Sequence, residues 1–176
     1  MRQLLALTLL SPPETGALVR LTRTILDCGC RIAQSSFTTL GSEAALVLLL
    51  SGSWDSIARL EGNLERLRDK QGLAIVYKRT AETEAHTDLL PYEIDLVALE
   101  HEGIVHEVAA FLDERSITVV DFTSSAYPAA HTGAPMFSLH MTIGIPAGTH
   151  IASLREEFIG FCDDLNLDAI LEPLKE

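Results

Sequence analysis

The sequence repeats itself once, and this repeat constrains the fold more than any other feature. Gly16 and Gly103 lie 87 residues apart, and each stands between a strand-like apolar run and a helix-like pattern. At the same offset, four apolar residues of the first copy fall on apolar residues of the second: Leu18 on Val105, Leu21 on Val108, Ile25 on Leu112, and Ile32 on Val119. A repeat of this length predicts one fold used twice.

The length of 176 residues fits two domains of about 80 residues each. We predict a first domain over residues 1–80, a linker over residues 81–91 and a second domain over residues 92–176. Such small domains bury a modest share of their surface on folding, so we expect each one to need a neighbour.

Hydrophobic periodicity predicts the same order of elements in both copies: strand, helix, strand, strand, helix, strand. In the first copy we expect them at residues 3–10, 16–28, 31–40, 43–50, 53–70 and 73–78. In the second copy we expect helices near residues 103–114 and 151–165, an alternating strand at 137–145, and a long hairpin loop at 127–135. This order is the ferredoxin-like βαββαβ arrangement, an α+β fold with an antiparallel sheet and both helices on one face.

Two strands of the first copy are apolar almost throughout, over residues 4–10 and 44–50. A strand with this pattern is usually covered on both faces. We therefore expect the first sheet to be covered by the second copy or by another subunit, and a homo-oligomer is the expected assembly.

The charge is distributed unevenly along the chain. The net charge is −12, because residues 1–80 carry +3 and residues 81–176 carry −15. An acidic protein repels phosphate backbones, so we expect no direct binding of nucleic acid. No apolar stretch approaches the roughly 18 residues of a membrane span, so we also expect no membrane insertion.

The three cysteines, Cys28, Cys30 and Cys162, form no disulfide framework, which favours a cytoplasmic protein. Arg2 precedes an apolar run as in a signal peptide. We do not expect secretion, because the run is short and its counterpart at residues 92–99 is internal. Cys28-Gly29-Cys30 predicts a helix end with Gly29 in the left-handed conformation. The sequence contains no hydrolase, nucleotide or dinucleotide motif, so we predict no catalytic residues, metal ligands or cofactor.

A strand that leads through a glycine into a helix exposes free backbone N–H groups, which can hold a carboxylate. This pattern makes Gly16 and Ala17 candidate ligand-binding residues in the first copy, and Gly103 and Ile104 in the second. Asp121 could accept the ammonium group of an amino acid if its strand neighbours the second glycine junction. Alternatively, Gly103 serves only the turn and Asp121 is solvated.

The repeated glycine junction and the order of elements resemble the ACT domain family, whose members are small sensing modules. The first copy also has strings similar to those of tandem ACT proteins that regulate transcription. They are DCGC-x-I at residues 27–32, LG-x-E at 40–43, LLSGSW at 49–54 and KRT at 78–80. The resemblance implies that the ligand's amino group meets a residue early in the second strand of a copy. Gln34 occupies that region in the first copy, and Asp121 and Ser124 occupy it in the second.

The resemblance also implies a function. It suggests a non-catalytic regulator that senses a small amino acid, with glycine suspected, and acts by contact with a DNA-binding transcription factor. The alternatives are a metabolite-binding regulatory subunit and a small ferredoxin-like enzyme.

Overall fold

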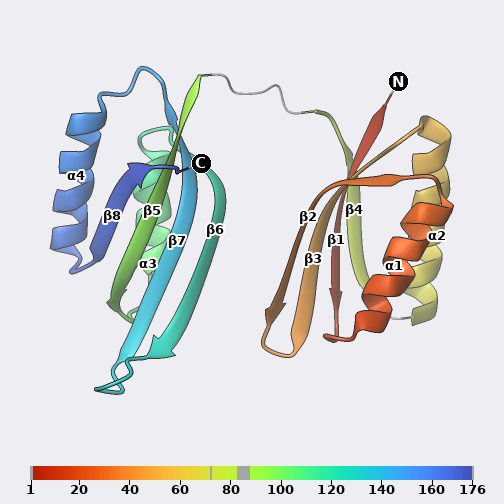
Figure 1. The fold of residues 1–176 in the computed structure, drawn as a ribbon, viewed down its shortest axis with the longest axis horizontal. Coiled ribbons are helices and arrows are strands. Elements are labelled where there is room, and N and C mark those ends of the chain that lie inside the picture. The colour runs from red at the N-terminus through yellow and green to blue at the C-terminus, as the bar shows by residue number, and fades with distance from the viewer. Residues whose placement is uncertain (1, 72, 83–87, 176) are drawn as a thin grey trace. The chain divides into compact units, whose positions relative to one another are not determined.

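The computed structural model describes residues 2–71, 73–82 and 88–175, which form two compact units, Met1–Glu84 and Ala85–Glu176. Each unit is a four-stranded antiparallel sheet with two helices on one face (Figure 1). The predicted fold class, two ferredoxin-like βαββαβ modules in tandem, is confirmed. Within the described residues, no helix is both long enough and apolar enough to cross a membrane.

The first unit contains two helices and four strands. Their bounds are β1 (Gln3–Ser11), α1 (Thr15–Asp27), β2 (Arg31–Leu40), β3 (Glu43–Gly52), α2 (Trp54–Gln71) and β4 (Ala74–Thr80). The strands lie in the order β2-β3-β1-β4. The first apolar run of the sequence is thus a central strand of the sheet.

The second unit repeats this order of elements. Their bounds are β5 (Leu89–Leu99), α3 (Ile104–Asp113), β6 (Thr118–Pro128), β7 (Pro135–Pro146), α4 (Ile151–Asp164) and β8 (Asp168–Pro173). The strands lie in the order β6-β7-β5-β8. The predicted linker extended too far, because Leu90 and Pro91 already pair with Ile145 and Gly144 of β7. Residues 83–87 of that linker lie outside the described residues.

Each unit has its own hydrophobic core between its sheet and its helices. In the first unit, alternate residues of β1 and β3 meet the buried side chains of α1 and α2, among them Leu21, Ile25 and Leu60. In the second unit, Phe158 of α4 packs with Val108 and Leu112 of α3 over β5 and β7. The i, i+3 and i, i+4 spacing of these helical residues is the pattern that predicted the helices.

Within the described residues, α1, α3 and α4 end in the same backbone motif. At the end of α1, Cys30 N–H donates to the Ile25 carbonyl and Gly29 N–H to the Leu26 carbonyl, while Gly29 has φ 73°. This is the Schellman arrangement predicted for Gly29, and both flanking thiols are buried. The helices α3 and α4 repeat these two bonds with Ser116 and Asn166 in the left-handed position, each with φ 55°.

Ser116 therefore occupies, without glycine's freedom, the position that Gly29 occupies in the first unit. A Cβ disfavours the left-handed region, so we expect Ser116→Gly to raise the free energy of unfolding by about 1 kcal/mol. The reverse change, Gly29→Ser, should lower it by a similar amount. Urea unfolding of both variants measures the difference, and a Ser116→Gly protein less stable than the wild type would contradict the shared cap.

Candidate functional site

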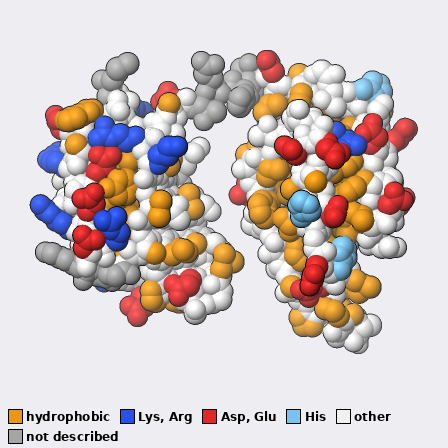
Figure 2. Space-filling model, turned by 180° about the vertical axis from the view of Figure 1, so that it is seen from behind, with side chains coloured by type: hydrophobic (Ala, Val, Ile, Leu, Met, Phe, Trp, Pro, Cys, Tyr) orange, Lys and Arg blue, Asp and Glu red, His pale blue; other side chains and the backbone are white. Residues whose placement is uncertain are grey.

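The open face of the second sheet, opposite its helices, is polar and acidic. On β7 the side chains of Ser138, His140 and Thr142 lie on this face, while Leu139 and Met141 between them are buried. This alternation confirms the half-exposed strand predicted from the sequence. Figure 2 shows that the charged side chains on the visible surface of this unit are mostly acidic and lie among hydrophobic ones, whereas Lys and Arg side chains gather on the first unit.

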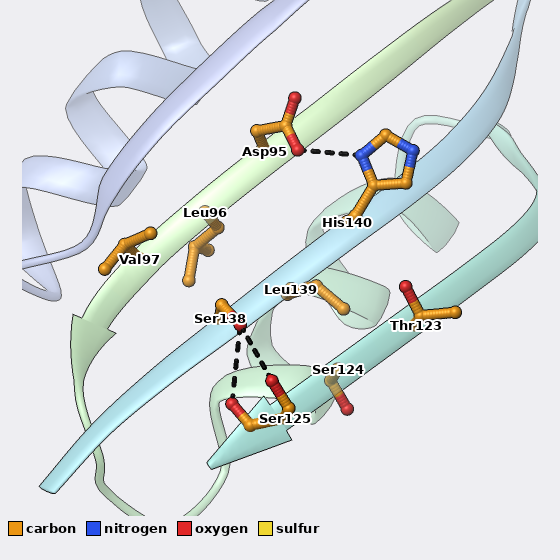
Figure 3. Close-up of a pocket in the computed structure, with 9 residues that line it drawn as sticks. All are labelled: Asp95, Leu96, Val97, Thr123, Ser124, Ser125, Ser138, Leu139 and His140. Carbon is orange, nitrogen blue, oxygen red and sulfur yellow. Dashed lines mark hydrogen bonds and ion pairs between the residues drawn. The ribbon is translucent and has the colours of Figure 1, made fainter. Parts of the chain in front are cut away.

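A pocket of about 330 Å³ lies on this open face, across β5, β7 and β6 (Figure 3). Its polar side chains converge from three strands because the register places Asp95 opposite His140, and His140 opposite Thr123. Two residues further along these strands, Ser125 and Ser138 lie opposite each other, with their hydroxyl oxygens 3.1 Å apart. The pocket therefore offers one carboxylate, one imidazole and three hydroxyl groups within a short stretch of sheet.

The Asp95–His140 pair is the shortest polar contact between the pocket's side chains. His140 Nδ1 lies 2.7 Å from Asp95 Oδ1, and the two side chains are about half exposed. The hydrogen bond to Asp95 raises the pKa of His140 above its ordinary value of 6.5, and the nearby carboxylates of Glu93 and Asp121 raise this pKa further. A protonated His140 can donate to a carboxylate, and Asp95 can accept from an ammonium group. The pocket thus offers a donor for the carboxylate and an acceptor for the ammonium group of an amino-acid zwitterion.

This raised pKa has a defined consequence for stability. The folded protein binds the His140 proton more tightly than the unfolded chain does. The stabilising contribution of the Asp95–His140 pair is therefore fully present below the unfolded pKa and is lost as pH rises through the folded pKa. We expect His140→Gln to destabilise the protein more at pH 5 than at pH 8.5, by a small amount because the pair is exposed. NMR titration of His140 in the wild type and in Asp95→Asn provides the check. The variant's pKa should fall, and an unchanged value would rule out the pair.

Three carboxylates also meet beside this pocket. Ligand atoms of Glu93, Asp95 and Glu172 lie within 4.8 Å of one another. Two of the three have cationic partners, because Lys175 Nζ lies 2.8 Å from Glu172 Oε1 and His140 contacts Asp95. With His140 protonated, these contacts offset two of the three negative charges of the cluster.

The structure does not bring together the ligand residues predicted for the second copy. Gly103 and Ile104 follow the end of β5, where Leu99 lies opposite Met136, and Met136 opposite Tyr127. Asp121 pairs with Thr142 of β7, which in turn pairs with Glu93 of β5. Glu93 lies six residues before Leu99 in β5. At about 3.3 Å per residue, roughly 20 Å separate the glycine junction from Asp121 within one unit. Asp121 therefore does not face that junction.

Ser124 lies closer to the pocket than Asp121 does. It is one residue out of phase with Thr123 and Ser125, so its side chain points to the other side of β6 although it contributes to the pocket wall. The ligand role of Ser124, like those of the other predicted residues, stays a prediction.

The ligand residues predicted for the first copy are also separated. Gln34 pairs with Leu49, which lies opposite Ala6, five residues before the end of β1 at Ser11. Gly16 is inside α1, and Ala17 N–H already donates to the Glu14 carbonyl at 3.2 Å. This junction therefore lacks the open glycine turn that was expected. Gly103 does fit that expectation, since it is the N-cap of α3 with φ 95°.

Sequence reasoning missed Asp95 and did not assign His140 to a site. Each residue stands at an ordinary alternating position of its own strand, and 45 residues separate them. Only the pairing register of β5 with β7 brings them together. The polar alternation at residues 138–142 was the one available signal.

The open face of the first sheet is apolar by contrast. Leu10, Val47 and Val76 lie on it with 44, 49 and 71% of their surfaces exposed. A face of this kind marks an interaction surface. That the second copy or another subunit covers this face of the first sheet stays a prediction.

Comparison with known proteins agrees with this architecture. Residues 3–78 match the ACT domain family, which covers the first unit from β1 to β4. The second unit has the same order of elements and the same order of strands. The first unit therefore matches an ACT domain, and the second unit has the same βαββαβ fold.

Two relatives that match over most of the chain are transcriptional repressors. The chain is 26% identical over 162 residues to the glycine cleavage system transcriptional repressor of Escherichia coli (strain K12), covering 92% of this chain and 85% of the relative. The repressor of Shigella flexneri matches equally well.

Two solved structures share the fold over the whole chain. An unknown protein from Galdieria sulphuraria has a TM-score of 0.79 at 18% identity, covering 99% of this chain and 100% of its own. A structure provisionally described as a glycine cleavage system transcriptional repressor has a TM-score of 0.75 at 24% identity, covering 100% and 99%.

Proposed function

We propose that this protein is a non-catalytic regulator of transcription that senses a small amino acid, with glycine as the first candidate. The observation that carries the proposal is the similarity to the repressor of Escherichia coli, which extends across both units. The ACT match of the first unit supports the sensing role. The buried free thiols of Cys28, Cys30 and Cys162 suit a reducing cytoplasm.

The pocket around Asp95 and His140 is the proposed ligand site. Asp95 would accept from the ligand's ammonium group, while His140 and the hydroxyl groups of Thr123, Ser125 and Ser138 would donate to its carboxylate. The pocket volume of about 330 Å³ suits a small ligand. The N-terminus of α3 at Gly103 and Ile104 is the second candidate seat for the carboxylate.

The regulator would act by contact with a DNA-binding transcription factor and not by binding DNA itself. The charge of −15 on residues 81–176 supports this mode, because it repels phosphate. The open apolar face around Val47 would be covered in a homo-oligomer.

Two experiments test this role. Deleting the gene in the source organism should derepress a small set of operons, both with and without added glycine. Transcript levels in the two conditions measure this change. Fluorescence anisotropy with duplex DNA should show no tight binding by the purified protein at physiological salt. Unchanged transcripts would contradict the regulatory role, and tight sequence-specific DNA binding would contradict regulation by protein contact.

A further inference from the structure

The helical side of the second unit carries a groove that the proposed ligand site does not use. It lies between α3 and α4 and has a volume of about 530 Å³. Its lining comes from both helices and from the turn after α3.

Aromatic rings form the floor of the groove. The ring centroids of Phe111 and Phe161 are 4.7 Å apart, and Phe158 lies beneath them with its centroid 5.5 Å from that of Phe111. Phe161 is only partly buried, so part of the floor faces solvent. The packed rings make this floor rigid, as an anchor site for apolar side chains requires.

The rim of the groove is acidic. Glu107, Glu114, Glu157 and Asp164 are all exposed, and Arg115 is the one cation among the lining residues. The Arg115 guanidinium lies 3.7 Å from the Phe111 ring centroid, and its Nε donates to Glu157 Oε2 at 3.0 Å. The same guanidinium lies 3.5 Å from Glu114 Oε2, so it contacts an aromatic ring and two carboxylates. With four carboxylates and one guanidinium, the lining carries a net charge of −3.

Small residues keep the groove open. Gly160 is inside α4, where glycine is a poor helix former, and a Cβ placed on it would meet nothing within 4 Å. Packing within the described chain therefore does not require glycine there. Ala110 faces the same groove from α3. Close approach of another backbone to α4 would account for the glycine.

We propose that this groove is the docking surface for a basic amphipathic helix of a protein partner. Apolar side chains of that helix would rest on Phe111 and Phe161. Its Lys and Arg side chains would reach the four carboxylates of the rim, so charge complementarity selects a cationic partner. The inference rests on the proposed regulation by protein contact and names the surface that makes it.

The experiment uses the full chain and a synthetic 18-residue amphipathic helix of Leu and Lys as the probe, with a Leu and Glu helix of the same pattern beside it. We expect the basic helix to bind and the acidic one not to bind. Gly160→Leu fills the groove and should weaken binding at least tenfold. Gly62→Leu is the matched control, because Gly62 is an exposed glycine inside α2 with equally open space. It should change the affinity less than twofold.

A second pair of variants separates the rim from the overall charge. Glu107→Gln with Glu114→Gln should weaken binding about tenfold at low salt. Glu93→Gln with Glu172→Gln removes the same charge from the open sheet face and should have much less effect. Thermal melts verify that each variant is folded.

Two results would overturn the inference: binding that is insensitive to Gly160→Leu, or equal losses in the two double variants. Titration of the same protein with glycine tests the proposed sensing role separately. Groove binding without an amino-acid response rejects the sensing role alone. An amino-acid response without groove binding rejects the docking surface alone.

Discussion

Phe158→Ala should remove about 3–5 kcal/mol from the stability of the second unit, which is a large part of the roughly 5–15 kcal/mol that a domain possesses. Phe158 is 1% exposed and contacts the rings of Phe111 and Phe161 at centroid distances of 5.5 and 6.3 Å. Truncation would leave a cavity among rigid rings that cannot collapse to fill it. Urea unfolding followed by far-UV circular dichroism measures the loss.

The single tryptophan makes this prediction specific to one unit. Trp54 is at the start of α2 in the first unit, whose core is a separate cluster of buried residues. Its fluorescence transition should therefore shift little in Phe158→Ala. Ile159→Ala is the control, because Ile159 is 50% exposed and should cost less than about 0.5 kcal/mol. A Trp54 transition that moves as far as the circular dichroism transition would contradict two separate cores.

Gly103→Val should lower the free energy of unfolding by about 1–3 kcal/mol. Gly103 has φ 95° as the N-cap of α3, a conformation that a β-branched residue resists, although open space surrounds its Cα. Gly16→Ala should instead be neutral or stabilise by up to about 1 kcal/mol, because Gly16 is a helical residue. Its new Cβ would meet only the flexible end of Arg20, at 3.0 Å.

Denaturant titration of these two variants, together with their amino-acid affinities, separates a turn from a binding seat. A folded Gly103→Val protein with unchanged affinity would show that Gly103 and Ile104 do not hold the ligand. Equal stability losses at Gly16 and Gly103 would contradict the different roles that the structure gives the two glycines.

The unequal roles of these glycines show how far the repeat could be read from the sequence. The offset of 87 residues correctly aligned the helices, since buried Leu21 and Ile25 of α1 match buried Val108 and Leu112 of α3. It did not align their starts, because α1 begins at Thr15, before Gly16, whereas α3 begins after Gly103. Helical periodicity reports the buried face of a helix, but the first turn depends on the geometry of the chain that enters it.

Local signals predicted the features that depend on neighbouring residues. The helix end at Gly29 was predicted correctly. Ser53, directly before α2, is likewise a local cap, because its hydroxyl oxygen accepts from Ser56 N–H at 3.1 Å. The candidate site could not be predicted in this way. Strand register sets both the contact between Asp95 and His140 and the separation of Gly103 from Asp121, and it emerges only when distant strands pair.

Calorimetric titration of the purified protein with each of the twenty amino acids tests the sensing role most directly. The account predicts saturable binding of glycine or one other small amino acid. At 100 times its dissociation constant, that ligand should stabilise the fold by about 2.7 kcal/mol. If none of the twenty produces heat or raises the melting temperature at millimolar concentration, the protein is not an amino-acid sensor.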